Sequence, residues 1–202
     1  SLFRLLGCDF IHLVLGEARK MIDDNSTNAN QIVVCEVFTG AIRSLKGRLW
    51  SKIATVKGVL TDFLLHIFQT IEPELHTLWF FALSMCTERL DPHRFFFLYD
   101  ALLAHRFEGE GLRVSRCVSL AVDVCLEVSD RLPYLFDGVI EKIRTHLFTE
   151  DFLQYQQDRE CAIIAIQILL LNEFDMKSKV LNEQCNRWLH EFVTGRPMNF
   201  VS

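Results

Sequence analysis

Hydrophobic residues recur along the chain with the three- and four-residue spacing of an α-helix, and the sustained alternation of a β-strand is hard to find. One clear stripe consists of Val34, Phe38, Ala41, Ile42 and Leu45. The next consists of Ile53, Val56, Leu60, Leu64, Ile67 and Ile71, and Glu72-Pro73 ends it. Because only a short connection around Gly47 separates these stripes, they predict an antiparallel helix pair.

The same spacing continues to the end of the chain. A very apolar helix is expected over residues 74–88, and Pro92 is placed to begin the next one, over residues 92–105. Glycines at 109 and 111 then break the pattern. Further stripes occupy residues 114–128, 136–147, 158–172 and 175–192, and in the first of these Arg116, Ser119, Asp123 and Glu127 are expected to lie opposite the apolar face.

These stripes predict about nine helices of roughly 14–20 residues joined by short turns, far above the usual helical third of a globular protein. Successive pairs occupy about 40 residues, which is the HEAT and armadillo period. We therefore expect an all-α fold in which residues 1–202 form a single continuous segment of a HEAT-like α-solenoid. Each pair would cover the open face of its neighbour. The very apolar helices at 74–88 and 158–172 would lie towards the inner layer.

Composition supports a folded interior and narrows the environment. Half of the 202 residues are hydrophobic, 17 are Phe and the net charge is −5, so a disordered chain is excluded. The longest apolar run, residues 161–171, is too short to cross a bilayer. The start of the chain, inside a helical pattern and without an initiator Met, is expected of a piece of a larger protein.

The cysteines indicate a reducing compartment. Seven are scattered without a C-x-x-C pair, an odd total that argues against a disulfide framework. We therefore expect the cytoplasm or nucleus. Cys117 and Cys125 share a helical face without a His at a partnering interval, so core thiols are favoured over a metal or nucleophile site.

Enzyme chemistry finds little support in the sequence. Phosphate-binding, dinucleotide-binding, zinc-protease and nucleophile-elbow motifs are all missing. Glu72 and Glu74, which flank Pro73, are expected to be helix-dipole partners and not an acid/base pair. The run Phe95-Phe96-Phe97 could form a docking surface, but packing of one helix on several sides is the favoured interpretation. We expect a protein without catalytic residues, metal ligands or a required cofactor.

One basic stretch departs from the acidic charge of the chain. Between residues 36 and 62 there is no internal acid, and five basic residues occur: Arg43, Lys46, Arg48, Lys52 and Lys57. The first three could simply complement the dipole at a helix C-terminus. The alternative is a polyanion site, with an inositol phosphate or an acidic protein surface as ligand. Lys52 and Lys57 are about 140° apart on a helix, so all five are not expected to converge.

Direct binding to nucleic acid is not expected, because the chain is acidic and lacks a basic recognition helix.

A resemblance to a known family sharpens this interpretation. The stretch EVFTGAIRS at residues 36–44, with Trp50 a turn later, resembles a repeat of the proteasome activator subunit four family, the large HEAT-repeat activators. The similarity continues through Leu78-Trp79, the turn at 88–92, the apolar helix at 97–103 and the break at 109–111, and it covers approximately residues 25–148.

The resemblance implies a helical dome that caps the 20S proteasome at its α-ring and opens its gate without ATP or ubiquitin. Members anchor through a C-terminal tail with a penultimate tyrosine, which Val201-Ser202 does not match, as expected of an internal fragment. The family also implies inositol polyphosphate binding at basic openings, and acetylated histones as partners. A different HEAT-repeat scaffold, such as a nuclear transport receptor or a trafficking adaptor, would share every fold-level feature and stays an alternative.

Overall fold

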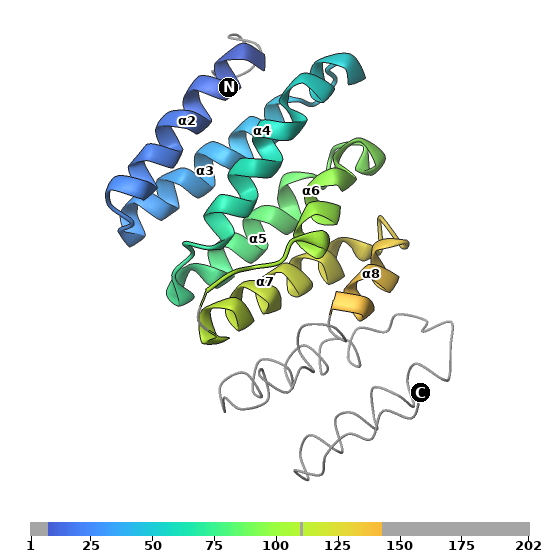
Figure 1. Ribbon diagram of the computed structural model, residues 1–202. Helices are drawn as coiled ribbons and strands as arrows, with labels where there is room; N and C mark the ends of the chain where they lie inside the picture. Colours follow the sequence, from blue (N-terminus) through green and yellow to red (C-terminus); the bar gives the residue numbers. More distant parts are fainter. Residues whose placement is uncertain (1–7, 110, 143–202) are drawn as a thin grey trace, which may run out of the picture.

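The computed structural model describes residues 8–109 and 111–142, and every regular element in them is helical (Figure 1). In chain order these elements are α2 (Cys8–Asp24), α3 (Asn28–Ser44), α4 (Trp50–Phe68), the 3-10 turn η1 (Pro73–Leu75), α5 (His76–Cys86), α6 (Pro92–Ala104), α7 (Gly111–Ser129) and α8 (Leu135–Lys142). The all-α prediction is confirmed.

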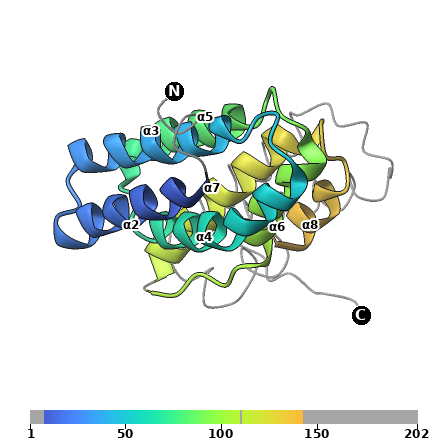
Figure 2. The same ribbon diagram turned by 90° about the horizontal axis from the view of Figure 1, so that it is seen from above.

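The helices form two layers, and the view from above shows α3 and α5 on one side and α2 and α4 on the other (Figure 2). In one layer α4 packs on α2, α6 on α4 and α8 on α6; in the other α5 packs on α3 and α7 on α5. Contacts of α2 with α3, and of α7 with α6 and α8, join the layers. Each helix is therefore covered by the next helix of its own layer, which is the serial stacking of a solenoid.

The period of the stack agrees with the one expected from the sequence. The helices α2, α4, α6 and α8 begin at Cys8, Trp50, Pro92 and Leu135, so about 42 residues separate equivalent starts.

Gly47, in the turn that follows α3, has φ of 75°, a left-handed conformation that glycine adopts without steric cost. The α6 start also matches its prediction, since Asp91 accepts a hydrogen bond from the His93 backbone N–H and Pro92 follows the cap.

The predicted stripes of α3 and α4 belong to the core. Val34, Phe38, Ala41 and Ile42 are fully buried on α3, and the α4 stripe from Ile53 to Ile67 is buried as well. The two helices meet through long side chains, with the Phe38 and Phe63 rings stacked at a centroid distance of 5.4 Å. The predicted stripe extended to Ile71, but α4 ends at Phe68, and Ile71 is only partly buried.

Two elements differ from the sequence prediction. The helix expected over 74–88 is shorter, because Pro73 opens a 3-10 turn before α5 begins at His76, and α5 ends at Cys86. On α7, burial extends beyond the predicted stripe to Leu120, Val122, Val124 and Leu126, while the predicted polar face is half-buried at Arg116, Ser119 and Asp123 and exposed at Glu127. The reason is that α7 packs against α5, α6 and α8.

The Phe95-Phe96-Phe97 run packs on several sides, as expected. Phe95 and Phe97 are buried, and Phe96 lies edge-on to Tyr134 with ring centroids 6.0 Å apart.

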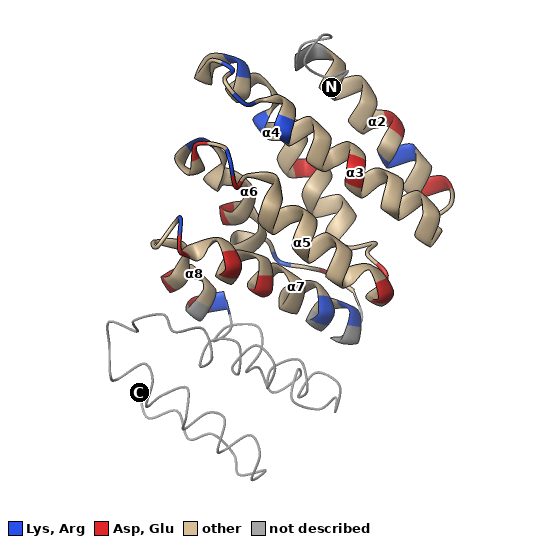
Figure 3. Ribbon diagram, turned by 180° about the vertical axis from the view of Figure 1, so that it is seen from behind, with Lys and Arg blue, Asp and Glu red and all other residues tan. Residues whose placement is uncertain are grey.

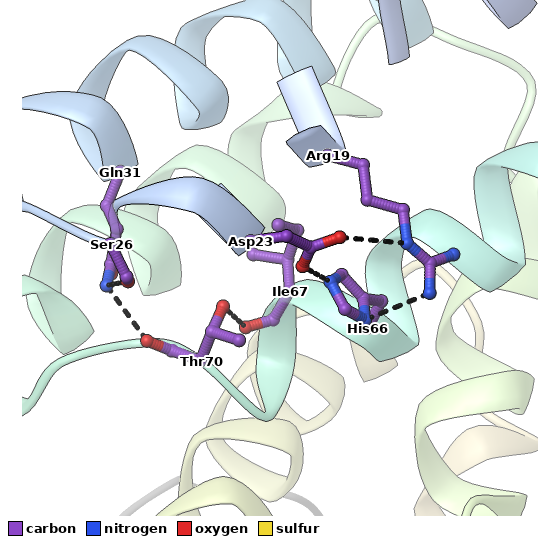
Figure 4. Close-up of polar contacts among 7 residues, drawn as sticks. All are labelled: Arg19, Asp23, Ser26, Gln31, His66, Ile67 and Thr70. Carbon is purple, nitrogen blue, oxygen red and sulfur yellow. Dashed lines mark hydrogen bonds and ion pairs between the residues drawn. The ribbon is translucent and has the colours of Figure 1, made fainter. Parts of the chain in front are cut away.

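Polar contacts tie α3 to the loop that follows α4 (Figure 4). The Gln31 side chain is 1% exposed; its Nε2 donates to Ser26 Oγ and to the Thr70 carbonyl, each at 2.8 Å. Its Oε1 accepts the Glu72 backbone N–H at 3.1 Å. The buried amide is thus fully satisfied, and it fixes the start of α3 against the chain leading into η1.

The predicted stripes at 158–172 and 175–192, and the part of the 136–147 stripe beyond Lys142, lie outside the described residues. Within the described residues, no helix combines the length and the apolar character that crossing a bilayer requires.

Candidate functional site

The structure separates the five basic residues singled out in the sequence. Arg43 lies in the last turn of α3, Lys46 and Arg48 lie in the turn between α3 and α4, and Lys52 and Lys57 lie on α4. Seen from behind, Lys and Arg gather around the α3–α4 turn and the adjoining part of α4 (Figure 3). Two of the five, Arg43 and Lys46, line a common pocket.

That pocket lies where α3 and α5 end, and we call it the basic pocket. It encloses about 360 Å³ and is lined by Arg43, Lys46, Met85, Cys86, Glu88, Arg89 and Leu90. Three cations and one carboxylate therefore surround a space large enough for a small ligand. Arg89, which comes from the α5–α6 turn, was not singled out from the sequence because 46 residues separate it from Arg43.

Helix dipoles reduce the excess of positive charge at this pocket. Because both α3 and α5 end here, the macrodipole of each contributes up to roughly half a negative charge. With Glu88 included, about one net positive charge remains. The sequence-based explanation made Arg43, Lys46 and Arg48 dipole partners, and the structure places Arg43 alone in the last turn of α3. Lys46 and Arg89 add positive charge at the pocket.

A buried hydroxyl network holds the end of α5, where Met85 and Cys86 line the basic pocket. The Tyr99 hydroxyl donates to the Leu83 carbonyl at 3.1 Å and lies 2.5 Å from Thr87 Oγ1. Because a phenol has one hydrogen, Thr87 must be the donor to Tyr99. Arg131 adds a hydrogen bond from Nη2 to the Ser84 carbonyl at 2.8 Å. These contacts fix the last turn of α5, and with it the orientation of the Arg89 turn.

The remaining basic residues are placed elsewhere. The Arg48 carbonyl accepts a hydrogen bond from Arg94 Nη1 at 3.1 Å, which joins the α3–α4 turn to α6. Lys52 is exposed in the first turn of α4. Lys57 Nζ lies 5.9 Å and 5.3 Å from the ring centroids of Phe96 and Phe97, within cation–π range. Lys57 therefore belongs to the α4–α6 contact.

Comparison with known proteins assigns the chain to a family. The family model described as proteasome activator complex subunit 4-like, HEAT repeat-like, matches residues 2–112. The chain belongs to this family. No curated protein and no solved structure matches the chain.

The family match and the resemblance found in the sequence overlap over residues 25–112. The match also includes α2, which precedes the residues that carried the resemblance. In this HEAT-repeat segment, the matched residues run through α6, so they contain Arg43, Lys46 and Arg89 of the basic pocket. The hydrophobic stack and the pocket are thus features of the part of the chain that carries the family signal.

The thiols of the HEAT-repeat segment are core residues. Cys35, Cys86, Cys117 and Cys125 are free and buried, as expected for Cys117 and Cys125. Burial raises the pKa of the Cys86 thiol to about 12, although the thiol lines the basic pocket and Arg43 acts in the opposite direction. Its Sγ donates to the Leu83 carbonyl at 3.2 Å. A neutral, hydrogen-bonded thiol is a poor nucleophile, so this pocket is suited to binding and not to thiol chemistry.

Among the described residues, no group of three or more His, Cys, Asp or Glu side chains is arranged to hold a metal ion.

Proposed function

We propose that this chain forms part of the wall of an activator that caps the 20S proteasome and opens its gate without ATP or ubiquitin. The observation that carries the proposal is the family match over residues 2–112. The proposed role is non-enzymatic: stacked helix pairs hold a curved surface around a substrate entrance, and the α-ring of the 20S particle is the partner of the intact protein.

The fold suits this role. A solenoid buries the apolar faces of its helices against successive neighbours, so its shape is set by repeated local packing and it presents an extended surface. The contacts of α2 with α4, α4 with α6 and α6 with α8 provide one continuous layer of this kind. A scaffold of a different HEAT-repeat class, such as a nuclear transport receptor or trafficking adaptor, would use the same packing, so binding decides between them.

The test is recovery of the endogenous protein that carries this sequence from cell extract, followed by sedimentation with purified 20S particles. Co-sedimentation that persists after ATP has been depleted supports the proposal. Failure to co-sediment, with nuclear import cargo or vesicle coat proteins recovered instead, would favour the other scaffold classes. Fractionation of the same extract tests the proposed location in cytoplasm and nucleus.

A second proposal concerns the basic pocket. We infer that Arg43, Lys46 and Arg89 bind an inositol polyphosphate, since they place three cations around about 360 Å³. Arginine can form paired hydrogen bonds with a phosphate group, while lysine contributes a point charge. Of the original five residues, Arg48, Lys52 and Lys57 do not line this pocket, so their contribution to such binding would be weak and long-range.

Titration of inositol hexakisphosphate at physiological salt separates these roles. Replacing Arg43, Lys46 and Arg89 with Ala should weaken binding at least tenfold, because each lost phosphate contact to a cation removes on the order of 1 kcal/mol. The matched control is Lys52→Ala, an exposed lysine outside the pocket, which should change affinity less than threefold. Equal losses in both variants, or no binding by the wild type, would remove the proposal.

The family resemblance also implies acetylated histones as partners. We propose that the intact protein binds acetylated histones. The same recovery experiment tests this when the recovered material is probed for acetylated histones.

A further inference from the structure

A second pocket, between α5 and α7, has the opposite chemistry, and we call it the acidic pocket. It encloses about 400 Å³ and is lined by His76, Thr77, Phe80, Phe81, Leu120, Asp123 and Glu127. Two carboxylates and two phenyl rings therefore meet in one cavity, and the lining residues that the structure describes include no Lys or Arg. From behind, the acidic positions of α7 lie towards α8 and its basic positions at the opposite end (Figure 3).

Asp123 is the unusual member of this lining. Its Oδ1 is enclosed and has no hydrogen-bond partner among the described residues. Burial raises the pKa of the Asp123 carboxyl to about 7, and within residues 8–109 and 111–142 no neighbouring cation offsets the effect. A partly buried carboxylate that lacks a partner is costly, and a cation brought by a ligand would relieve that cost.

The aromatic residues supply the second half of the recognition chemistry. Phe81 is 59% exposed, and its ring lies edge-on to Phe80 with centroids 5.2 Å apart. Exposed aromatic faces bind both the aliphatic stem of a long side chain and the cation at its end. Glu127, one helical turn after Asp123, is exposed and adds a second negative charge at the mouth.

We propose that the acidic pocket binds an unmodified lysine or arginine side chain presented by a partner protein. The stem would lie against Phe80 and Phe81, and the charged end would pair with Asp123 and Glu127. This inference rests on the pocket alone and does not depend on proteasome binding. A neutral apolar side chain would leave the Asp123 carboxylate unpaired, so charge complementarity selects the cation.

The probe is Nα-acetyl-lysine amide, with Nα-acetyl-norleucine amide as the neutral analogue of nearly the same stem. Binding to the full chain is followed by NMR through the Phe81 ring and the Asp123 carboxyl carbon. The lysine probe should shift both signals, and its presence should lower the titration midpoint of Asp123. The norleucine probe should bind at least fivefold more weakly, which corresponds to losing one partly buried ion pair.

Variants locate the interaction. Asp123→Asn and Glu127→Gln should each weaken the lysine probe several-fold, and Phe81→Ala should weaken both probes. The control Asp130→Asn removes an exposed acid just after α7 that does not line the pocket. Glu127 is exposed, so Glu127→Gln keeps the test valid even if Asp123→Asn alters folding.

Lysine binding should weaken as the pH falls below about 7, because Asp123 then gains a proton. Among the described residues, the pocket lining also holds Glu127 on the same helix and His76 on α5, and the charges of Arg116 and Glu74 act on His76. Burial and Arg116 lower the pKa of His76, so its positive charge appears at lower pH than that of an ordinary histidine. The proposal would be overturned if the norleucine probe bound as tightly as the lysine probe, or if Asp130→Asn lost as much affinity for the lysine probe as Asp123→Asn. Concentration-dependent self-association of the chain without probe would overturn it as well.

Discussion

His66 on α4 lies 2.6 Å through Nε2 from Asp23 Oδ1 on α2, and Arg19 completes the contact (Figure 4). Arg19 Nη2 is 3.2 Å from His66 Nδ1, and its Nε is 3.8 Å from Asp23 Oδ2. A guanidinium can only donate hydrogen bonds, so Nδ1 accepts and Nε2 carries the hydrogen that Asp23 receives. The tautomer of His66 is thus set by the network, and the network joins successive helices of one layer.

This contact should make a small but measurable contribution to stability. In a double-mutant cycle with Asp23→Ala and His66→Ala, we expect a coupling free energy of about 0.5–1 kcal/mol in urea unfolding, since Asp23 is half-exposed. Asp24→Ala, which removes the exposed neighbouring acid, serves as the control and should show no coupling with His66→Ala. A coupling of zero for the Asp23 pair would contradict the assigned network.

Gln31 should be more important for stability than its polar character suggests. Gln31→Leu removes the acceptor of the Glu72 N–H and the donor to the Thr70 carbonyl. We therefore expect a loss of about 1–3 kcal/mol in the free energy of unfolding. The control Asn28→Leu changes an exposed polar residue at the start of the same helix. Similar losses in the two variants would show that the buried amide contributes nothing specific.

The buried cysteines should resist alkylation until the chain unfolds. Burial raises the pKa of Cys35 to about 12 and that of Cys117 to about 11, and it raises the pKa of Cys125 further. At about pH 8 the reactive thiolate fraction is therefore small, in addition to the steric protection. Mass spectrometry after iodoacetamide treatment should find Cys35, Cys86, Cys117 and Cys125 unmodified in the native chain and modified in denaturant. Rapid native labelling of any of these four would show that its helix is not packed as described.

Asp123 should make stability depend on pH in a defined direction. Its folded pKa of about 7 lies above the ordinary carboxyl value of 3.8, so the folded state holds the proton more tightly than the unfolded state. This contribution is present below the unfolded pKa and is lost as the pH rises through about 7. Asp123→Asn should therefore stabilise the chain near pH 8 by about 1–2 kcal/mol and have little effect near pH 4. Comparison of urea midpoints at the two pH values checks this, and a larger gain at pH 4 would reverse the assigned direction.

The periodicity of single helices was sufficient to predict their buried faces but not the pockets. Val34, Phe38 and Ile42 are buried because their own helix places them on one face, a relationship that the spacing alone expresses. Arg89 joins Arg43 only through stacking of α5 on α3, which no local pattern encodes.

Burial of a polar residue was equally hidden from the sequence. Asp123 lies opposite the most regular apolar stripe of α7, and a helix packed on one side would expose it. The neighbouring α5, α6 and α8 instead surround much of α7, so even its polar side is partly covered. Lys57 illustrates the same limit, because its aromatic partners Phe96 and Phe97 belong to α6.

The most direct test of the proposed activity is hydrolysis of a fluorogenic peptide by purified 20S particles, with and without the purified endogenous protein, after ATP has been removed. We expect the protein to increase the rate several-fold, and the increase to saturate at a fixed ratio of protein to 20S particle. An unchanged rate under conditions in which the two are shown to be in contact, or an increase that requires ATP, would contradict the proposed function.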